Sequence, residues 1–315
     1  MAHYIIRRLI HSIFVIWGCA TLVFFMIRLI PGDPVVQMLG PEYTPAAAEA
    51  LRHKLGLDEP LLVQYTRWFG NMLTGDLGGS IASGETVVGA IRTGLPKTLS
   101  LAFVSFVIAT AIAVPAGIIA ALNRNRPIDY IASVVAFVGV SMPSFWFGII
   151  LILIFAVNLH WLPAVGYAEI GKDGVVEWFR RLILPSLAIG AAYAAILMRF
   201  VRAGLLEALG SDYIRTARAK GLRNRRVVMT HALRNALIPV VTVAGIQLAL
   251  LLSGTVVVET VFAIRGIGRI LIGAIFDRDY PVVQGIILVI AVIFVLANLV
   301  VDIAYTVIDP RIRYG

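Results

Sequence analysis

The chain has 315 residues, of which 59% are hydrophobic and 14% are charged, and its mean hydropathy is +0.90. Soluble domains contain about 45–50% apolar and about 25% charged residues, so this composition excludes disordered, collagen-like and small disulfide-linked proteins and is typical of a membrane protein. Cys19 is the only cysteine, which rules out a disulfide within the chain. The net charge of +9 would suit nucleic-acid binding, but such proteins do not devote half their length to charge-free runs, so no nucleic-acid partner is expected.

Long apolar runs recur along the whole chain. A helix that crosses a bilayer needs about 20 mostly apolar residues. Six stretches qualify: Leu9 to Ile30, Thr98 to Leu122, Tyr130 to Val157, Leu182 to Met198, Leu237 to Val258 and Val282 to Val301. The first run is longer than a usual signal-peptide core and no cleavage site follows it, so we interpret it as a retained signal anchor. The sequence therefore predicts an all-α membrane protein with six transmembrane helices.

The basic residues predict the orientation of these helices. With the N-terminus inside, the inner segments 1–8, 123–129, 199–236 and 309–315 hold 15 basic residues in 60 positions. The outer segments hold about one basic residue in ten. Because cytoplasmic loops carry the excess of Lys and Arg, both termini are predicted to be cytoplasmic.

These spans divide the chain into four parts. Residues 1–30 form a cytoplasmic stub and the first helix, and residues 31–97 form an extracytoplasmic loop region. Residues 98–308 form a five-helix transmembrane core that includes the cytoplasmic loop 199–236, and residues 309–315 form a cytoplasmic tail. The outer loop opens with a turn at Pro31-Gly32-Asp33-Pro34 and carries helical patches at 45–55 and 61–73.

The inner loop 199–236 contains a short segment with helix-start and helix-stop residues. Ser211 or Asp212 can accept hydrogen bonds from the first backbone amides, and Gly221 suits a left-handed residue at the C-terminal end. Tyr213, Thr216, Ala217 and Lys220 share one face of this helix by their spacing. Such a helix suits docking into a groove of a partner protein. The alternative is a basic loop that obeys the positive-inside rule and touches anionic lipid.

Four blocks of sequence carry a family resemblance. They are Pro31-Gly-Asp-Pro34, Tyr213-Ile-Arg-Thr-Ala-Arg-Ala-Lys-Gly-Leu222 with His231-Ala-Leu-Arg-Asn-Ala-Leu-Ile-Pro-Val-Val-Thr242, Arg278-Asp-Tyr-Pro-Val-Val-Gln-Gly285, and Asp309-Pro-Arg-Ile-Arg313. In this order, they resemble the permeases of the dipeptide, oligopeptide and nickel branch of binding-protein-dependent ABC importers. Three positions depart from the family pattern: Arg215-Thr216-Ala217 replaces Glu-Ala-Ala, Arg28 stands where His is frequent, and Ile264-Arg265 replaces Trp-Pro.

The resemblance implies a type I ABC-importer permease in the bacterial inner membrane. It implies four kinds of partner: a second permease, two ABC ATPase subunits that hold ATP and Mg, an extracytoplasmic substrate-binding protein, and membrane lipids. The cytoplasmic segment then couples the permease to the ATPases. Its residues are Tyr213, Arg215, Thr216, Ala217, Ala219, Lys220, Gly221 and Leu222.

The sequence has no pattern for catalysis by this chain. The only Gly-Lys pair, Gly171-Lys172, is followed by Asp173, so the phosphate-binding loop G-x-x-x-x-G-K-[ST] is not present. The five histidines have no ligand spacing, and there is no G-x-S-x-G or H-E-x-x-H motif. We therefore expect no catalytic residue, no metal site and no cofactor on this chain.

Polar residues within or next to the spans are the candidates for a translocation path, because polar groups inside a membrane are functional candidates by default. Gln247 and Asn298 lie in the fifth and sixth spans, and Ser141-Met142-Pro143-Ser144 interrupts the third. The candidate path residues are Arg28, Asp33, Ser141, Met142, Ser144, Gln247 and Asn298.

The sequence thus predicts a permease subunit of an ATP-driven importer for short peptides. Glutathione and nickel are alternative cargoes within the same family. A rival from another class is a secondary transporter driven by an ion gradient, but such carriers usually place a charged site at mid-membrane, and the charged groups here lie near the span ends.

Overall fold

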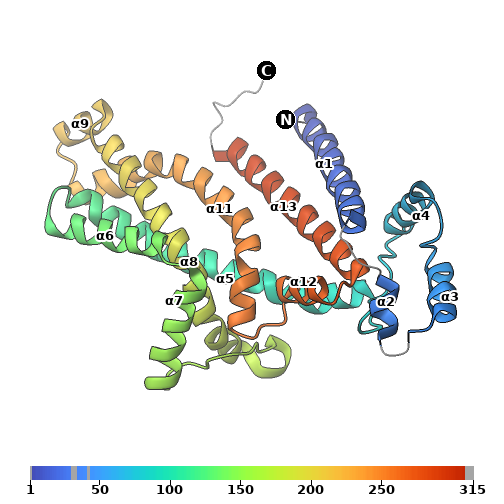
Figure 1. The fold of residues 1–315 in the computed structure, drawn as a ribbon. Helices are drawn as coiled ribbons and strands as arrows, with labels where there is room; N and C mark the ends of the chain where they lie inside the picture. The colour runs from blue at the N-terminus through green and yellow to red at the C-terminus, as the bar shows by residue number, and fades with distance from the viewer. Residues whose placement is uncertain (1, 30–33, 41–42, 309–315) are drawn as a thin grey trace. The chain divides into compact units, whose positions relative to one another are not determined.

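The computed structural model describes residues 2–29, 34–40 and 43–308 (Figure 1). Within these ranges the chain is helical, with an isolated bridge between Gly79 and Thr86 and no strand. Five described helices are long and apolar enough to cross a membrane, and a bent helix pair makes a sixth crossing if it counts as one span. Apart from Ile30, which lies outside the described residues, and the break at Met142 and Pro143, the six predicted spans fall within these helices, so the predicted all-α fold is confirmed. The orientation of the termini stays a prediction.

The chain divides into two compact units, each made of two segments. The first unit comprises residues 1–96 and 266–295, and the second comprises 97–265 and 296–315. The long helices α5 and α13 run from one unit into the other.

The first unit holds the N-terminal helices and the outer region. Its elements are α1 (Ala2–Leu29), α2 (Pro34–Leu39), α3 (Pro45–Leu55), α4 (Leu61–Leu73), the start of α5 (Val87–Leu122), α12 (Ile267–Phe276) and most of α13 (Tyr280–Ile308). The two helical patches predicted in the outer loop are confirmed as α3 and α4. Helix α3 begins where Thr44 accepts a hydrogen bond from the Ala47 amide, and it ends at Gly56 with φ of 65°. The predicted Pro31–Pro34 turn lies largely outside the described residues.

The second unit holds the other membrane helices and the inner loop. Its elements are the rest of α5, α6 (Pro127–Ser141), α7 (Ser144–Leu151), the π-helix η2 (Ile152–Asn158), α8 (Ile170–Leu209), α9 (Asp212–Ala219), α10 (Asn224–Arg226), the π-helix η3 (Val227–Ala232) and α11 (Leu233–Val261). The predicted third span is broken at Met142, and its two halves are bent by 108°. The residue before a proline avoids the helical region, and Met142 is extended at φ −81° and ψ 128° before Pro143.

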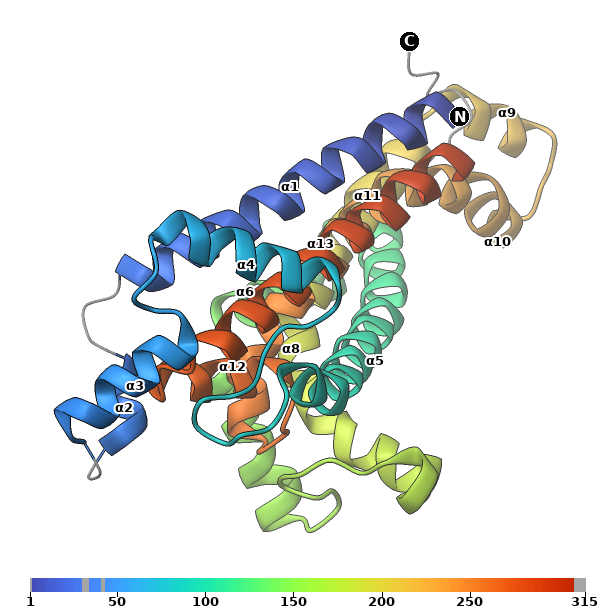
Figure 2. The same ribbon diagram turned by 90° about the vertical axis from the view of Figure 1, so that its right-hand side faces the viewer.

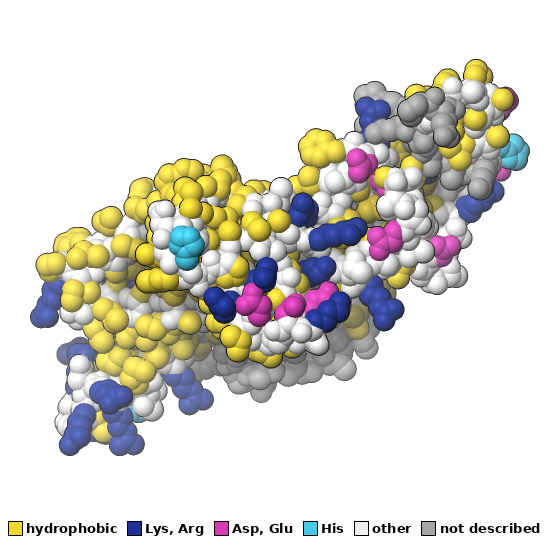
Figure 3. All heavy atoms as spheres, turned by 90° about the horizontal axis from the view of Figure 1, so that it is seen from below, with side chains coloured by type: hydrophobic (Ala, Val, Ile, Leu, Met, Phe, Trp, Pro, Cys, Tyr) yellow, Lys and Arg dark blue, Asp and Glu magenta, His cyan; other side chains and the backbone are white. Residues whose placement is uncertain are grey.

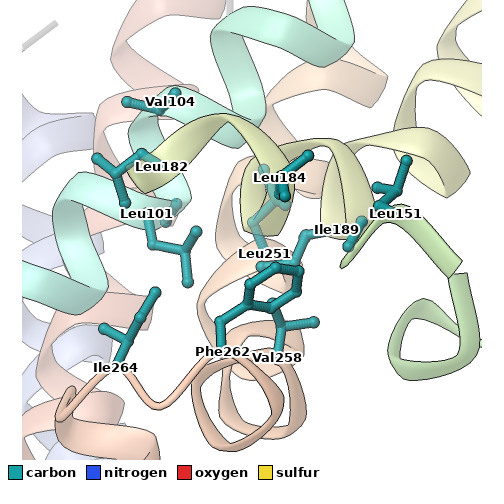
Figure 4. Packing of buried hydrophobic residues seen from close by; sticks show 12 residues of the cluster. Leu101, Val104, Leu151, Leu182, Leu184, Ile189, Leu251, Val258, Phe262 and Ile264 are labelled. Carbon is teal, nitrogen blue, oxygen red and sulfur yellow. The ribbon is translucent and has the colours of Figure 1, made fainter. Parts of the chain in front are cut away.

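Apolar side chains from α5, α7, α8 and α11 form the core of the second unit (Figure 4). Phe262 is 1% exposed and points into a group of leucine, isoleucine and valine side chains. A Cβ added to Gly148 would lie 2.9 Å from the Phe262 ring, so this glycine lets α7 approach the aromatic side chain. Helices α5 and α8 also approach closely, because a Cβ on Gly117 would lie 2.8 Å from the Met198 carbonyl oxygen.

The first unit is held together by an apolar cluster and a buried carboxylate. Val87 and Ile91 of α5 pack against Ile267 of α12 and Ile286 of α13. Asp279 is 2% exposed and accepts hydrogen bonds from Ser80 Oγ at 2.5 Å, the Ala82 amide at 3.3 Å and the Val282 amide at 3.4 Å. Asp279 therefore caps the start of α13 and holds the turn before α5.

Many apolar side chains are exposed in this chain, as a lipid environment or helical partners require. The surface in Figure 3 shows large areas of hydrophobic side chains beside a group of charged ones. Phe137 of α6 is 70% exposed and Phe14 of α1 is 64% exposed. Such large apolar areas are unusual on soluble monomers.

A buried ion pair joins α6 to α8 within the second unit. Asp129, with a side chain 3% exposed, accepts from Arg202 Nε at 2.6 Å and from a second Arg202 nitrogen at 2.7 Å. The backbone amide of Asn125 donates to the same carboxylate at 3.0 Å. This geometry is a bidentate pair with a third donor, which satisfies a carboxylate away from water.

Removing the Asp129 carboxylate is expected to destabilise the second unit. In the Asp129→Ala variant the partly buried Arg202 loses its partner, which costs roughly 3 kcal/mol, at the low end for such pairs because the Arg202 side chain is 28% exposed. The midpoint of thermal unfolding of the detergent-solubilised protein measures this loss.

The control variant is Glu169→Ala, which breaks an exposed pair. The Lys172 ammonium lies 2.7 Å from Glu169 and lowers the pKa of that carboxyl, yet both side chains are at least half exposed, so little stability depends on them. Equal unfolding midpoints for the two variants would contradict the conclusion that Asp129 stabilises the contact between α6 and α8.

Candidate functional site

The inner loop forms a compact helical hairpin at the ends of α8 and α11. Helix α8 ends at Leu209, α9 follows after a two-residue turn, and the chain returns through α10 and η3 into α11. At the base of this hairpin a Cβ on Gly204 would lie 2.8 Å from the Ala236 carbonyl oxygen, so α8 and α11 almost touch. The hairpin therefore links α9 to both α8 and α11.

Two apolar side chains anchor α9 to the hairpin. Ile214 is fully buried and Ala217 is 9% exposed. Both belong to a cluster with Leu205 of α8 and with Val227 and Val228 of η3. This cluster, which also includes Ala121, Ala208, Ala232 and Ala236, is named the loop cluster below. It makes α9 a fixed part of the second unit.

The ends of α9 agree with the prediction at one end only. Gly221 has φ of 74°, its amide donates to Arg218 at 2.9 Å, and the Leu222 amide donates to Ala217 at 3.4 Å. These bonds form the Schellman ending that the glycine predicted, and half-buried Leu222 packs against the loop cluster. At the other end, Ser211 makes no side-chain cap, because its Oγ donates to the Ala208 carbonyl at 2.5 Å instead.

The exposed face of α9 differs from the predicted one in a single residue. Tyr213 is 42% exposed, and Thr216 and Lys220 are also exposed, as expected of a docking face. Ala217 was predicted on this face but points inward, because Ile214 and Ala217 together form the buried side of the helix. Arg215, Arg218 and Ala219 are exposed as well. The solvent-exposed side of α9 therefore combines basic side chains with the aromatic side chain of Tyr213 and the small side chains of Thr216 and Ala219.

Of the candidate path residues in the first unit, the structure describes Arg28. The guanidinium of Arg28 stacks 3.4 Å above the Phe24 ring, donates to the Phe24 carbonyl oxygen at 3.1 Å and donates to Gln64 at 3.2 Å. Arg28 thus joins α1 to α4. Asp33 lies outside the described residues.

The break in the third span opens two cavities within the second unit. One of about 500 Å³ is lined by Ser141, Met142 and the exposed aromatic residues Phe145 and Trp146 among others. The second, of about 370 Å³, lies among α5, α6, α7 and α8 and is lined largely by alanines. Met142 lines both, and neither lining includes a charged residue.

The other predicted path residues are dispersed. Ser141 Oγ donates to the Phe137 carbonyl at 2.9 Å, and Ser144 begins α7. Gln247 is 5% exposed, and its Nε2 has no hydrogen-bond partner among the described residues. Asn298 is half-buried on α13. Within the second unit, the structure brings together Ser141, Met142 and Ser144 at the break.

Sequence analysis missed the buried acidic residues that tie the helices together. Glu259 is fully buried in α11 and accepts from Thr98 Oγ1 of α5 at 2.6 Å. It lies one residue beyond the predicted fifth span, and α11 continues past it to Val261. The acidic Glu259 at the end of an otherwise apolar run was the feature of the sequence that could have indicated a buried carboxylate. The partners of Asp129 and Asp279 are far away in sequence, so local patterns give no sign of them.

Comparison with known proteins covers the whole chain. Residues 113–314 match the model of the "binding-protein-dependent transport system inner membrane component" family, and residues 1–102 match the model of its N-terminal region. The oligopeptide transport system permease protein AppB of Bacillus subtilis is 41% identical over 316 residues, with 100% of both chains covered. The glutathione transport system permease protein GsiC of Escherichia coli is 44% identical over 314 residues, again with 100% of both chains covered.

A solved structure shares the fold. An inward-facing structure of the MetNI methionine ABC transporter aligns with a TM-score of 0.56 at 22% identity, covering 70% of this chain and 96% of that chain. At that identity the likeness concerns the fold alone.

The inward position of Ala217 generates a prediction. In the Ala217→Arg variant a charged side chain replaces a methyl group in the loop cluster, so α9 is expected to detach. Trypsin then cuts the loop at least about tenfold faster, since each 1.4 kcal/mol of lost local stability raises the open population about tenfold. The rate of tryptic cleavage of the solubilised protein measures the effect.

The matched control is Ala219→Arg, two residues away and exposed. Both variants add one tryptic site to a loop that already has nine basic residues. Similar cleavage rates for the two variants would contradict the anchoring of α9 through Ala217.

Proposed function

The chain belongs to the family of binding-protein-dependent transport system inner membrane components, and on this premise we propose that it forms, with a second permease, the translocation path of an ATP-driven importer for short peptides. It is a multi-pass permease component of the membrane. ATP and Mg are bound and used by two partner ATPase subunits. An extracytoplasmic binding protein delivers the cargo.

One observation carries the proposal: α9 is anchored on one side and exposed on the other. Ile214 and Ala217 fix it to the loop cluster, while Tyr213, Thr216 and Lys220 face solvent. A short helix held this rigidly is suited to lie in a groove of a partner and to carry that partner's movement. A loop that only followed the positive-inside rule would need no such buried anchor.

The loop geometry supports a mechanical route from the ATPases to the membrane helices. ATP binding closes the two ATPase subunits against each other, and α9 moves with the groove that holds it. Because α9 is packed against α8 and η3, and α8 approaches α11 at Gly204, the movement reaches α11 and also α8, which lines a cavity beside the break in the third span. ATP favours one arrangement of the spans only if the ATPases dock α9 more tightly in that arrangement.

The proposed cargo is a short peptide. Relatives over the full chain are named for oligopeptide, peptide and glutathione transport, and glutathione is kept as the alternative cargo. The two cavities of this chain lack charged lining residues. A path for a peptide with charged ends therefore requires a second wall, which the second permease supplies.

Purification of the tagged chain from its native membrane tests the proposed assembly. We expect co-purification of a second six-span permease and of one or two ATPase subunits with a phosphate-binding loop. In proteoliposomes the complex is expected to take up labelled di- to pentapeptides only under two conditions. ATP must be present on the side of the membrane that carries the ATPase subunits, and the binding protein must be present on the opposite side. An excess of unlabelled glutathione distinguishes the alternative cargo by competition.

Two results would overturn the proposal. One is recovery of the chain alone or as a self-oligomer. The other is peptide uptake driven by an ion gradient without ATP, which would instead favour a secondary transporter.

Gly221 gives a test of the coupling role of α9. A Cβ there meets open space, but φ of 74° costs a non-glycine residue about 1–2 kcal/mol, most for a β-branched one. Gly221→Val is therefore expected to distort the end of α9 and lower uptake about five- to thirtyfold, because a strain of that size shifts the docked population by that factor. ATP hydrolysis without cargo is expected to persist.

The control is Gly221→Asn, since asparagine tolerates the left-handed region. Both variants are compared at equal amounts of assembled complex in the membrane. Coupled uptake that is normal in Gly221→Val would argue against this role.

A further inference from the structure

Helix α4 packs along a part of α1 that lies inside a candidate membrane span. That span runs from Arg7 to Met26. Tyr65 of α4 shares a hydrogen bond of 2.8 Å with Thr21, and its hydroxyl accepts from Trp17 Nε1 at 3.1 Å. At 1.5 Å per residue, Thr21 lies about 8 Å and Trp17 about 14 Å inside the Met26 end of the span. The Tyr65 side chain therefore reaches membrane depth.

Aromatic packing fixes α4 in this position. Phe24 of α1 is fully buried, and its ring centre lies 5.3 Å from those of both Tyr65 and Trp68. Phe25 stacks on Tyr65 at 5.8 Å, and Arg28 reaches Gln64 from the same side of α1. Figure 2 shows α4 beside the C-terminal half of α1. The contact is a packed helix pair with polar bonds at its edges.

The apolar side of α4 is wider than its contact with α1. Leu62 and Leu73 are 71% and 70% exposed, and they lie three helical turns apart on the same side of the helix. The opposite side carries Arg67 and Asn71, both exposed, and Arg67 pairs with Glu59 at 3.5 Å. Helix α4 is thus amphipathic, with an apolar flank that nothing else in the described chain covers.

We propose that α4 is an interfacial membrane helix, embedded in the leaflet at the C-terminal end of α1 with Leu62 and Leu73 among lipid acyl chains. Its polar side, with Arg67 and Asn71, then lies at the level of the headgroups and water. Amphipathic helices with large aliphatic residues on one side and cations on the other take this position. Tyr and Trp side chains concentrate at the same depth.

Lipid is the occupant that fits the neighbouring surface. The exposed side of α1 includes Ile13, Leu22 and Met26, each more than half exposed, so the span against which α4 packs is itself apolar on its outer side. Part of the region 31–97, predicted as a water-exposed loop, is on this account a membrane element. Fewer residues of the region 31–97 then extend into water than the sequence predicts.

Site-directed spin labelling of the full chain, purified with its native subunits and placed in lipid nanodiscs, tests the proposal. Cys19→Ser removes the only native cysteine, and single cysteines are introduced as Leu62→Cys, Leu73→Cys and Asn71→Cys. Asn71 is the matched control, on the same helix and opposite Leu62, and Glu49→Cys on α3 is the aqueous reference. Collision rates of each label with oxygen, which concentrates in the bilayer, and with a water-soluble nickel chelate are compared.

We expect the oxygen-to-nickel collision ratio at positions 62 and 73 to exceed that at 71 and 49 severalfold. Ratios at 62 and 73 that match position 49 would place α4 in water and overturn the proposal. Labels at 62 and 73 shielded from both reagents would mean that a protein partner covers the flank, which also overturns it. Leu62→Cys and Leu73→Cys test the proposal independently of each other. A fluorescent bimane label at either position repeats the measurement without a nitroxide on the protein, and we expect its fluorescence to be quenched by a quencher on the lipid acyl chains but not by iodide in water.

Discussion

A carboxylate that is buried among apolar helices must find its hydrogen-bond donors inside the protein, because lipid offers none. Three buried carboxylates of the described chain meet this constraint by joining separate elements. Asp129 binds Arg202 between α6 and α8, Glu259 binds Thr98 between α11 and α5, and Asp279 binds the turn at Ser80. Between these clamps the helices pack through small residues such as Gly117, where dispersion contacts replace the hydrophobic effect. The helices are thus held both by polar pairs and by close apolar packing.

The inner loop is built on the opposite principle, since it is exposed to water and can use hydrophobic burial. Ile214 and Ala217 bury the inner side of α9 against side chains from α8 and η3. The left-handed Gly221 ends the helix and sends Leu222 back to the same cluster. An isolated helix of eight residues is not stable in water. The stability of α9 therefore comes from its packing against the second unit. Helix α9 is thus held as a folded part of the second unit.

Local patterns predicted the elements but not the pairs between them. The apolar runs, the helical patches of the outer loop and Pro143 in the third span depend on residues a few positions apart, and each appears in the structure where expected. The partners of Asp129, Glu259 and Asp279 are 73, 161 and 199 residues away, which no local periodicity can indicate. The wrong placement of Ala217 has a related cause. Spacing defines the two sides of a helix, but only the tertiary packing of Ile214 decides which side is buried.

The translocation path was the least predictable part, and the structure gives the physical reason. Polar residues were expected to mark it, yet Arg28 is used to join α1 to α4, and Ser141 returns its hydroxyl to its own helix. What remains at the break in the third span is an uncharged surface of serine, methionine and aromatic side chains. Such a surface does not bind one cargo strongly, because it offers shape and contact but few fixed hydrogen bonds. On the proposed function, selection among peptides falls to the binding protein, and a weakly binding path suits a permease that must release what it receives.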